Sequence, residues 1–310
     1  MKRLLCPIII FLLVVSGCSN AVQTKSERVS EGTKKLQIVT TFYPMYYFTQ
    51  KVAGNSANVE LLIPNGAEPH DWEPTAKDMA KIQDADIFIY NSRYFESWTE
   101  KVLKSINDSD LTVIEASKGV ELMNALESEE ENHSDHASSK DPHVWLSPVL
   151  AQQEVDTITN AIEKLDPNHK NEYEKNAEDF KSQLADLDHL YKETINKAEK
   201  KEFVTQHAAF GYLAKQYGLT QIPIAGLSPD VEPTLGKLKE LTELTKKKHV
   251  KVIYFEGLTS SKVAQTLANE IGAKTEVLNP LEGLTKEEQE KGLDYIDVMK
   301  KNLEALKLSF

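Results

Sequence analysis

A long uninterrupted segment, residues 168–200, constrains this chain more than any other stretch, because its interior contains neither glycine nor proline. One apolar stripe runs through it at spacings of three and four, the period of a helix face. The stripe is formed by Tyr173, Ala177, Phe180, Leu184, Leu187, Tyr191, Ile195 and Ala198. A helix of this length would extend ~48 Å and would cross two lobes. A break near 186–188 is the alternative, but the continuous stripe favours a single helix.

Short apolar runs alternate with longer amphipathic segments on both sides of this helix, which is typical of βα units and parallel sheets. The predicted strands before it are Leu36–Thr41, Val59–Ile63, Asp86–Asn91 and Leu111–Ala116, with helices starting near Pro44, Thr75 and Phe95. The predicted strands after it are Glu202–Thr205, Gln221–Ala225, Val250–Phe255 and Lys274–Leu278. We therefore expect an α/β fold with an N-terminal (β/α) lobe over 35–167, a linking helix over 168–200 and a C-terminal (β/α) lobe over 201–310.

Residues 1–18 are typical of an export signal. Two cations, Lys2 and Arg3, precede the apolar run Leu4–Val15, which is shorter than the roughly 20 residues that a bilayer span needs. Small residues stand directly before Cys18, and this pattern resembles the lipobox of bacterial lipoproteins, in which the cysteine carries a lipid anchor. A plain secretory peptide is the alternative. Polar residues 19–34 predict a flexible tether.

The two cysteines limit the kinds of metal site that this chain can build. Cys6 would be removed with the signal and Cys18 would be lipidated, so the mature domain would have no thiol. A transition-metal site must then use histidine and carboxylate, which suit zinc and neighbouring divalent ions. The formal net charge of −12 argues against nucleic acid or an anionic bilayer as the ligand.

A loop rich in proline, glycine and acids follows the second predicted strand and presents His70. Pro69 and Pro74 restrict its backbone, and Trp72 provides an apolar anchor. An isolated loop histidine is more often an ordinary surface residue. The interpretation of His70 as a ligand therefore depends on other stretches with the same features.

Three other stretches place a candidate ligand near a strand end or a helix start. His143 precedes a helix opened by Pro148, His207 follows a predicted strand, and Glu282 follows the turn at Asn279. In an open parallel sheet, ligands bind beyond the carboxyl ends of the strands. Two of the four candidates fall in each lobe, so the predicted site lies between the lobes. Three neutral imidazoles and one carboxylate satisfy a tetrahedral divalent cation.

Several motifs, in order along the whole chain, are similar to those of the zinc-binding lipoproteins of bacterial ABC transporters, the cluster A-I or cluster 9 family. They are the lipobox, Thr-Thr-Phe-Tyr-Pro-Met at 40–45, Glu-Pro-His-Asp-Trp-Glu-Pro at 68–74, Asp-Pro-His-Val-Trp-Leu-Ser-Pro at 141–148, Thr-Gln-His-Ala-Ala-Phe-Gly-Tyr at 205–212 and Gly-Leu-Ser-Pro-Asp at 226–230. The resemblance implies two (β/α) lobes joined by a long helix, a buried metal between them, and delivery of that metal to a permease.

The resemblance also implies the ligand set, in which His70, His143 and His207 match the family's metal histidines. The fourth position falls on Glu282. In some members the fourth ligand is water or another group, and Glu256 is then the rival carboxylate. His207 stands where manganese-binding members typically have glutamate, which favours zinc over the manganese alternative.

A short acidic stretch, Glu127–His136, precedes His143 and contains His133 and His136. Zinc-specific relatives have a loop rich in histidine and acids at this place that is thought to gather metal, and the resemblance implies such an auxiliary role here. A solvated loop without a role is the alternative.

The function implied is that of an extracytoplasmic, lipid-anchored monomer that captures Zn²⁺ for an ABC permease and catalyses no reaction. The ATPase would be another chain, because no Gly-x-x-x-x-Gly-Lys-[Ser/Thr] loop occurs here. A zinc hydrolase is one competitor, with Asp71, Glu73 or Asp141 activating water. A fourth ligand at Glu282 would close the open position that hydrolysis needs. A surface adhesin with a structural metal is the other competitor.

Overall fold

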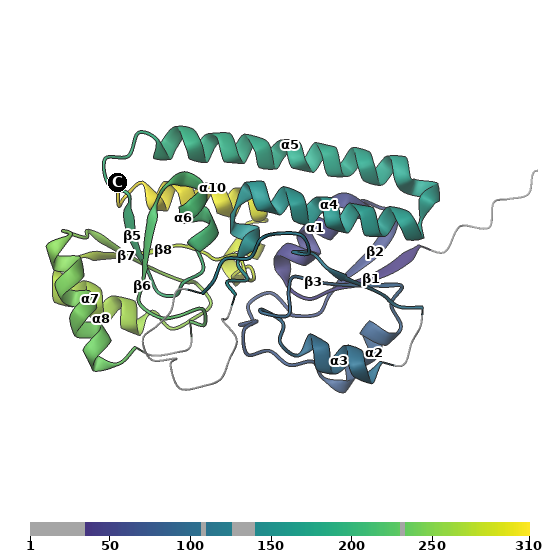
Figure 1. Ribbon diagram of the computed structural model, residues 1–310, viewed down its shortest axis with the longest axis horizontal. Helices are drawn as coiled ribbons and strands as arrows, with labels where there is room; N and C mark the ends of the chain where they lie inside the picture. Colours follow the sequence, from purple (N-terminus) through teal and green to yellow (C-terminus); the bar gives the residue numbers. More distant parts are fainter. Residues whose placement is uncertain (1–34, 107–109, 126–139, 230–232) are drawn as a thin grey trace, which may run out of the picture. The chain divides into compact units, whose positions relative to one another are not determined.

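Across the described residues of the computed structural model, 35–106, 110–125, 140–229 and 233–310, the strands form two four-stranded sheets (Figure 1). The first sheet has the order β2-β1-β3-β4 and the second the order β6-β5-β7-β8, and every pairing is parallel. The strands are β1 Leu36–Thr40, β2 Ala57–Leu61, β3 Ile87–Tyr90, β4 Thr112–Glu115, β5 Glu202–Thr205, β6 Thr220–Pro223, β7 Val252–Phe255 and β8 Lys274–Val277. The α/β prediction with two parallel-sheet lobes is confirmed, and the two sheets share one topology.

Helices connect the strands as the alternation predicts. They are α1 Tyr43–Ala53, α2 Ala76–Gln83, α3 Thr99–Ser105, α4 Pro148–Leu165, α5 Lys170–Ile195, α6 Gly211–Tyr217, α7 Leu235–Lys247, α8 Lys262–Ile271, α9 Lys286–Glu290 and α10 Tyr295–Leu306, with 3-10 turns at Val144–Leu146 and Pro167–His169. Thr75 caps α2 in a reciprocal pair with Asp78, and Ser147 caps α4, which opens with Pro148. These local signals explain why the two helices begin where they do.

Seven of the eight predicted strands differ from the structure by one or two residues at one or both ends, and the helix expected near Phe95 also begins later. The helix expected near Phe95 begins at Thr99, after a turn in which the carboxylate of Glu96 accepts hydrogen bonds from the backbone N–H groups of Asn91 and Ser92. The strand expected from Val59 begins at Ala57 and ends at Leu61. Its last predicted residue, Ile63, still donates a backbone hydrogen bond of 2.9 Å to Thr41, outside the strand. The apolar pattern therefore marked buried residues more accurately than it marked strand ends.

The long helix is single, as the apolar stripe predicts, but it is shorter than expected. It covers Lys170–Ile195 and contains no break at 186–188. Pro167 opens a separate 3-10 turn before it, and Ala198 lies in a turn after it. The stripe from Tyr173 to Ile195 is buried against α1, α4, α6 and α10. The helix, ~39 Å long at 1.5 Å per residue, therefore contacts helices from both lobes (Figure 1).

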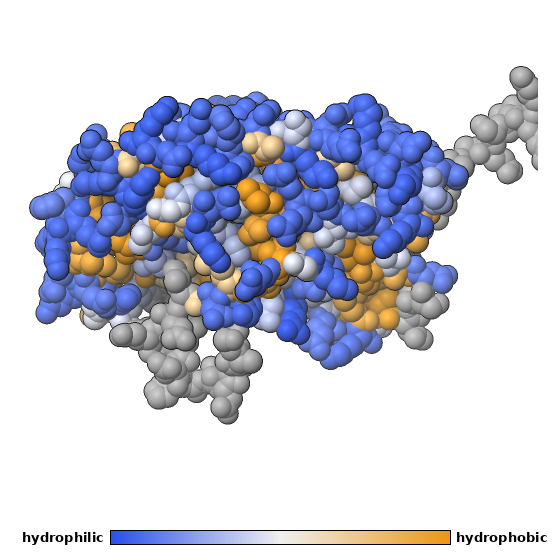
Figure 2. Space-filling model, turned by 45° about the horizontal axis from the view of Figure 1, so that its top comes forward, coloured by the Kyte–Doolittle hydropathy of each residue, from blue (hydrophilic) through white to orange (hydrophobic). Residues whose placement is uncertain are grey.

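One large apolar core contains residues from both lobes and from α5, so the lobes share buried surface. A smaller core lies between the second sheet and helices α7 and α8. Figure 2 shows one face of the molecule, where hydrophilic residues cover most of the area and hydrophobic residues gather in smaller areas. None of the helices in the described part of the chain has the length and apolar character needed to cross a bilayer.

An unpaired carboxyl group lies inside the protein. Glu154, on α4, is 0% exposed, and no group within the described residues hydrogen-bonds to either of its oxygens. Burial, together with the nearby carboxylate of Glu96, raises the pKa of Glu154 well above its ordinary value. The folded protein therefore keeps a proton on Glu154 at pH values where the unfolded chain has lost it, and this lowers stability as the pH rises above about 4.5.

We expect the substitution Glu154→Met to raise the free energy of unfolding by roughly 1–3 kcal/mol at neutral pH, because it removes a buried polar group without a partner. The gain should grow as the pH rises above about 4.5, because the unfolded parent ionises there while the raised pKa of Glu154 delays ionisation in the folded parent. Urea unfolding across this pH range measures it. Gln153→Met, at an exposed position of the same helix, is the control. Equal or lower stability of Glu154→Met at neutral pH would contradict the prediction.

Candidate metal centre

Four residues predicted from the sequence come together in the structure. His70, His143, His207 and Glu282 each offer one ligand atom, and these atoms all lie within 4.8 Å of one another. The Nε2 atoms of the three histidines lie 3.2, 3.3 and 3.4 Å, in that order, from Oε1 of Glu282. The three nitrogens thus converge on a single carboxylate oxygen.

Loops at the ends of strands and helices position these side chains. His70 follows β2, His207 lies between β5 and α6, and Glu282 follows β8. His143 precedes a 3-10 turn that leads into α4. The lobes touch beside this cluster, because Trp145 Nε1 donates to the carbonyl of Pro280 over 2.8 Å. The cluster therefore lies where the strand-end rule places it, between the two lobes.

The four side chains are not equally buried. Those of His143 and His207 are 0% exposed and that of Glu282 is 1% exposed, whereas that of His70 is 11% exposed. The backbone N–H of His70 donates to Oε1 of Glu68 over 3.0 Å, and the Phe95 ring lies edge-on to its imidazole with centroids 4.8 Å apart. His70 is the one histidine of the cluster that solvent reaches.

Two carboxylates outside the cluster orient the buried histidines. Asp141 Oδ1 lies 2.8 Å from Nδ1 of His143 and also accepts its backbone N–H over 2.9 Å. Glu256 accepts from Nδ1 of His207. A proton on Nδ1 leaves the lone pair of Nε2 directed into the cluster, which is the arrangement of histidines that bind metals.

The rival carboxylate, Glu256, therefore lies on the outer side of the His207 ring, while Glu282 lies among the three Nε2 atoms. The sequence did not identify the orienting roles of Asp141 and Glu256. For Asp141 a signal existed, because an acid two residues before a histidine can accept that histidine's own N–H group. For Glu256 no local signal existed, since it lies 49 positions from His207.

Opposing charges set the protonation of the cluster. Burial alone would raise the pKa of Glu282, but the three imidazoles, led by His70, hold it well below its ordinary value. Burial alone would lower the pKa of His143 and of His207, but carboxylates raise both: chiefly Asp141 for His143, and Glu256 for His207. Burial, together with the charge of Glu282, raises the pKa of Glu68 to about 8. Without a cation, the imidazoles of His143 and His207 therefore tend to hold protons, whereas Glu282 tends to stay ionised.

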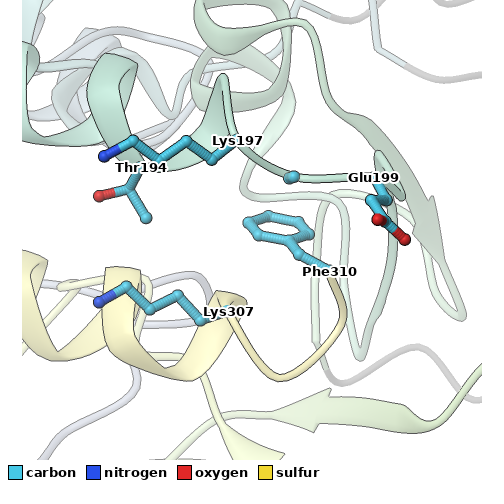
Figure 3. A pocket seen from close by; sticks show the side chains of 6 residues that line it. Thr194, Lys197, Glu199, Lys307 and Phe310 are labelled. Carbon is cyan, nitrogen blue, oxygen red and sulfur yellow. The ribbon is translucent and has the colours of Figure 1, made fainter.

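Three imidazole nitrogens and one carboxylate form a donor set that suits Zn²⁺ in four-coordinate geometry. No other group of three or more histidine, cysteine or acidic side chains arranged for a metal occurs among the residues whose structure is described. A surface hollow of about 510 Å³ lies between the ends of α5 and α10 (Figure 3), and no residue of the cluster lines it. It is lined by Thr194, Lys197, Ala198, Glu199, Lys307 and Phe310.

Three residues singled out in the sequence lie outside the described residues: Cys18, His133 and His136. The predicted lipid anchor at Cys18 stays a prediction. The predicted auxiliary role of His133 and His136 also stays a prediction.

Comparison with known proteins gives consistent matches. A family model described as "ZnuA: Zinc-uptake complex component A periplasmic" matches residues 38–308. The high-affinity zinc uptake system protein ZnuA of Bacillus subtilis is 58% identical over 299 residues, covering 95% of this chain and 93% of that protein. The zinc-binding lipoprotein AdcA of Streptococcus pneumoniae is 48% identical over 303 residues, covering 96% of this chain and 60% of AdcA.

Solved structures agree with these matches. The Zn(II)-bound ZnuA-like domain of Streptococcus pneumoniae AdcA has 49% identity and a TM-score of 0.76, covering 89% of this chain and 99% of that domain. The laminin-binding protein Lmb of Streptococcus agalactiae, described as bifunctional with adhesin and metal transporting activity, has 37% identity and a TM-score of 0.77, covering 89% of this chain and 99% of Lmb. Because the family model spans nearly all of the folded chain and the relatives keep both its sequence and its fold, this chain belongs to the ZnuA family of zinc-uptake components.

Proposed function

We propose that this protein captures Zn²⁺ outside the cytoplasm and delivers it to the permease of an ABC transporter whose ATPase is a separate chain. The convergence of three Nε2 atoms on Glu282 between the lobes is the observation that carries the proposal. His70, His143, His207 and Glu282 would hold the ion as cargo. Membership of a zinc-uptake family supports zinc as the metal.

The donor set favours zinc over manganese. Three imidazoles with one carboxylate suit zinc, whereas manganese prefers sites dominated by oxygen ligands. The relatives in Bacillus subtilis and Streptococcus pneumoniae are named for zinc uptake and zinc binding, and this supports the same cargo here.

The ZnuA family is a transport family, and we propose that this chain catalyses no reaction. A catalytic zinc keeps an open position for water or substrate. With Glu282 among the three histidines, four protein ligands would fill a tetrahedral shell. A zinc hydrolase therefore finds no support in the cluster.

We also propose how the mature protein is organised. Residues 1–18 would be a lipoprotein signal with Cys18 as the lipid anchor, and 19–34 would tether the folded part to the outer face of the cell membrane. Residues 35–167 and 201–310 would form the two lobes of a monomer, with 168–200 linking them. His133 and His136 would gather zinc without belonging to the tight site.

Zinc titration of the folded chain tests the function. Calorimetry should show one tight zinc equivalent per chain, with manganese bound much more weakly. In a strain that lacks its own zinc-binding lipoprotein, expression of this chain with its cognate permease should restore growth on low zinc. Absence of a tight zinc equivalent would refute the proposal.

The orienting carboxylates provide a finer test. Glu256→Gln should weaken zinc binding by about 10–100-fold, because it removes the charge that fixes and strengthens the His207 ring. Glu270→Gln, at an exposed acid on α8, is the matched control and should bind zinc like the parent. If Glu256→Gln also bound like the parent, Glu256 would have no orienting role.

Adhesion is a second candidate function, because Lmb, at 37% identity, is described as an adhesin as well as a metal transporter. Binding of the purified protein to immobilised laminin, with and without zinc, would test it. Saturable binding would support adhesion as a second activity, and its absence would leave transport alone.

A further inference from the structure

The peptide that precedes His143 is bound by both lobes at consecutive carbonyls. The hydroxyl of Tyr212, on α6 of the C-terminal lobe, donates to the carbonyl of Asp141 over 2.7 Å. The side chain of Asn91, at the end of β3 in the N-terminal lobe, donates to the carbonyl of Pro142 over 2.9 Å. Asn91 is 0% exposed and Tyr212 4% exposed, so water competes little for either bond.

The hydroxyl of Tyr212 acts here both as a donor and as an acceptor of hydrogen bonds. Its hydroxyl also accepts the backbone N–H of Met123 over 2.8 Å, while Asp141 donates its own N–H to the carbonyl of Met123 over 2.9 Å. One hydroxyl from the C-terminal lobe thus joins two neighbouring segments that lead to His143. The motif at 205–212 contains this tyrosine, although the sequence assigned a role only to His207.

Gly211 allows α6 to approach this peptide. A Cβ atom at position 211 would lie 2.7 Å from Oδ2 of Asp141. Asp141 has little freedom to move away, because its other oxygen binds both the backbone N–H and Nδ1 of His143. The contact between α6 and Asp141 is therefore close on the side where Asp141 orients the imidazole.

We infer that the Asp141–Pro142 peptide, held by Tyr212 from one lobe and by Asn91 from the other, couples the relative position of the lobes to the orientation of His143, so that Tyr212 and Asn91 are positioning residues that slow zinc release. The two bonds act in series. Asn91 holds the peptide that carries Asp141 and His143 to the rest of the N-terminal lobe, so separation of the lobes breaks the Tyr212 bond and frees this peptide on the side of the C-terminal lobe. This inference rests on the proposed function, since it requires His143 to bind the transported ion.

Zinc release from the loaded protein to a chelating dye, followed by stopped flow, tests the inference. Tyr212→Phe should release zinc about tenfold faster than the parent, the lower end of the effects seen when an outer-shell partner of a metal ligand is lost. Tyr217→Phe is the matched control, because it removes a hydroxyl from the same helix that pairs with Asp188 instead. It should release zinc at the parent's rate.

Two further variants make the test independent of any single substitution. Gly211→Ala keeps the Tyr212 hydroxyl but displaces Asp141, and Asn91→Leu removes the opposite bond, so each should also speed release. Because the bonds act in series, Tyr212→Phe combined with Asn91→Leu should release zinc about as fast as the faster single variant. Multiplied effects in the double variant would show two independent contacts and overturn the coupling.

Absorption of bound Co²⁺ separates positioning from a merely structural role. A positioning role changes the ligand-field bands of Co²⁺ in Tyr212→Phe. A structural role lowers only the melting temperature of the metal-free protein and would overturn the inference.

The zinc experiments separate the two proposals. If the parent fails to bind zinc, the proposed function fails. If the parent and Tyr217→Phe bind zinc tightly and Tyr212→Phe releases zinc at the parent's rate, only the inference fails.

Discussion

Replacing His70, His143 or His207 singly with alanine should weaken zinc binding by about 100-fold or more. Four-ligand zinc sites in small peptides are worth roughly 10–16 kcal/mol, so one ligand carries about 3 kcal/mol, or two factors of ten in affinity. His70 and His207 lie in loops after strands and His143 lies before a 3-10 turn, so none of the three belongs to either apolar core. The fold of each variant should therefore persist.

Glu282→Ala should weaken binding less than the histidine variants, because water can take a fourth position on zinc. Calorimetric titration compares all four variants with His189→Ala, which removes an exposed imidazole from α5. The control should bind zinc like the parent. If all three histidine variants also bound like the parent, the assignment of the site would be wrong.

Acidification should abolish zinc binding steeply. Each imidazole must be neutral to coordinate zinc, and the ordinary histidine pKa is about 6.5. Neighbouring carboxylates raise the pKa of His143 and raise that of His207 further, against the opposing effect of burial. Protons therefore compete with zinc already near neutral pH. With three sites protonated, the affinity should fall by up to about 1,000-fold per pH unit.

The folding stability of the metal-free protein should change with pH in the opposite direction, so that it increases on mild acidification. The raised pKa values of His143 and His207 contribute stability that is fully present below about 6.5 and is lost as the pH rises through their folded-state values. The lowered pKa of Glu282 contributes stability that is present above about 4.5 and is lost as the pH falls through its folded-state value. The metal-free site should thus be more stabilising near pH 6 than near pH 8.

Two measurements check this pair of expectations. Zinc titration from pH 7.5 to pH 5 should show the steep loss of affinity, and urea unfolding of the metal-free protein between pH 6 and pH 8 should show the opposite trend. Comparison of the parent with His207→Ala in the unfolding series isolates the contribution of the site. A zinc affinity that stayed flat between pH 7 and pH 5 would exclude a site with three histidines.

Local sequence patterns determined the architecture and the residue types of the site. The stripe from Tyr173 to Ile195 predicted the long helix, because helix formation depends on the side chains that neighbouring turns present to one partner surface. Short apolar runs that alternate with amphipathic segments predicted the strands, because strands of a parallel sheet are buried on both faces. The absence of cysteine from residues 19–310 limited a metal site there to histidine and carboxylate. The histidines stood out because each follows a strand or precedes a helix.

Only the tertiary structure shows where each carboxylate lies relative to the histidines. Glu256 and Glu282 each follow a strand of the second lobe, and their local surroundings gave no way to tell an orienting group from a member of the cluster. The packing of the lobes places Glu282 among three Nε2 atoms and Glu256 behind the His207 ring. The contact of Tyr212 with Asp141 spans 71 positions. Such pairings follow from how the two sheets and α5 pack, which no period of neighbouring residues encodes.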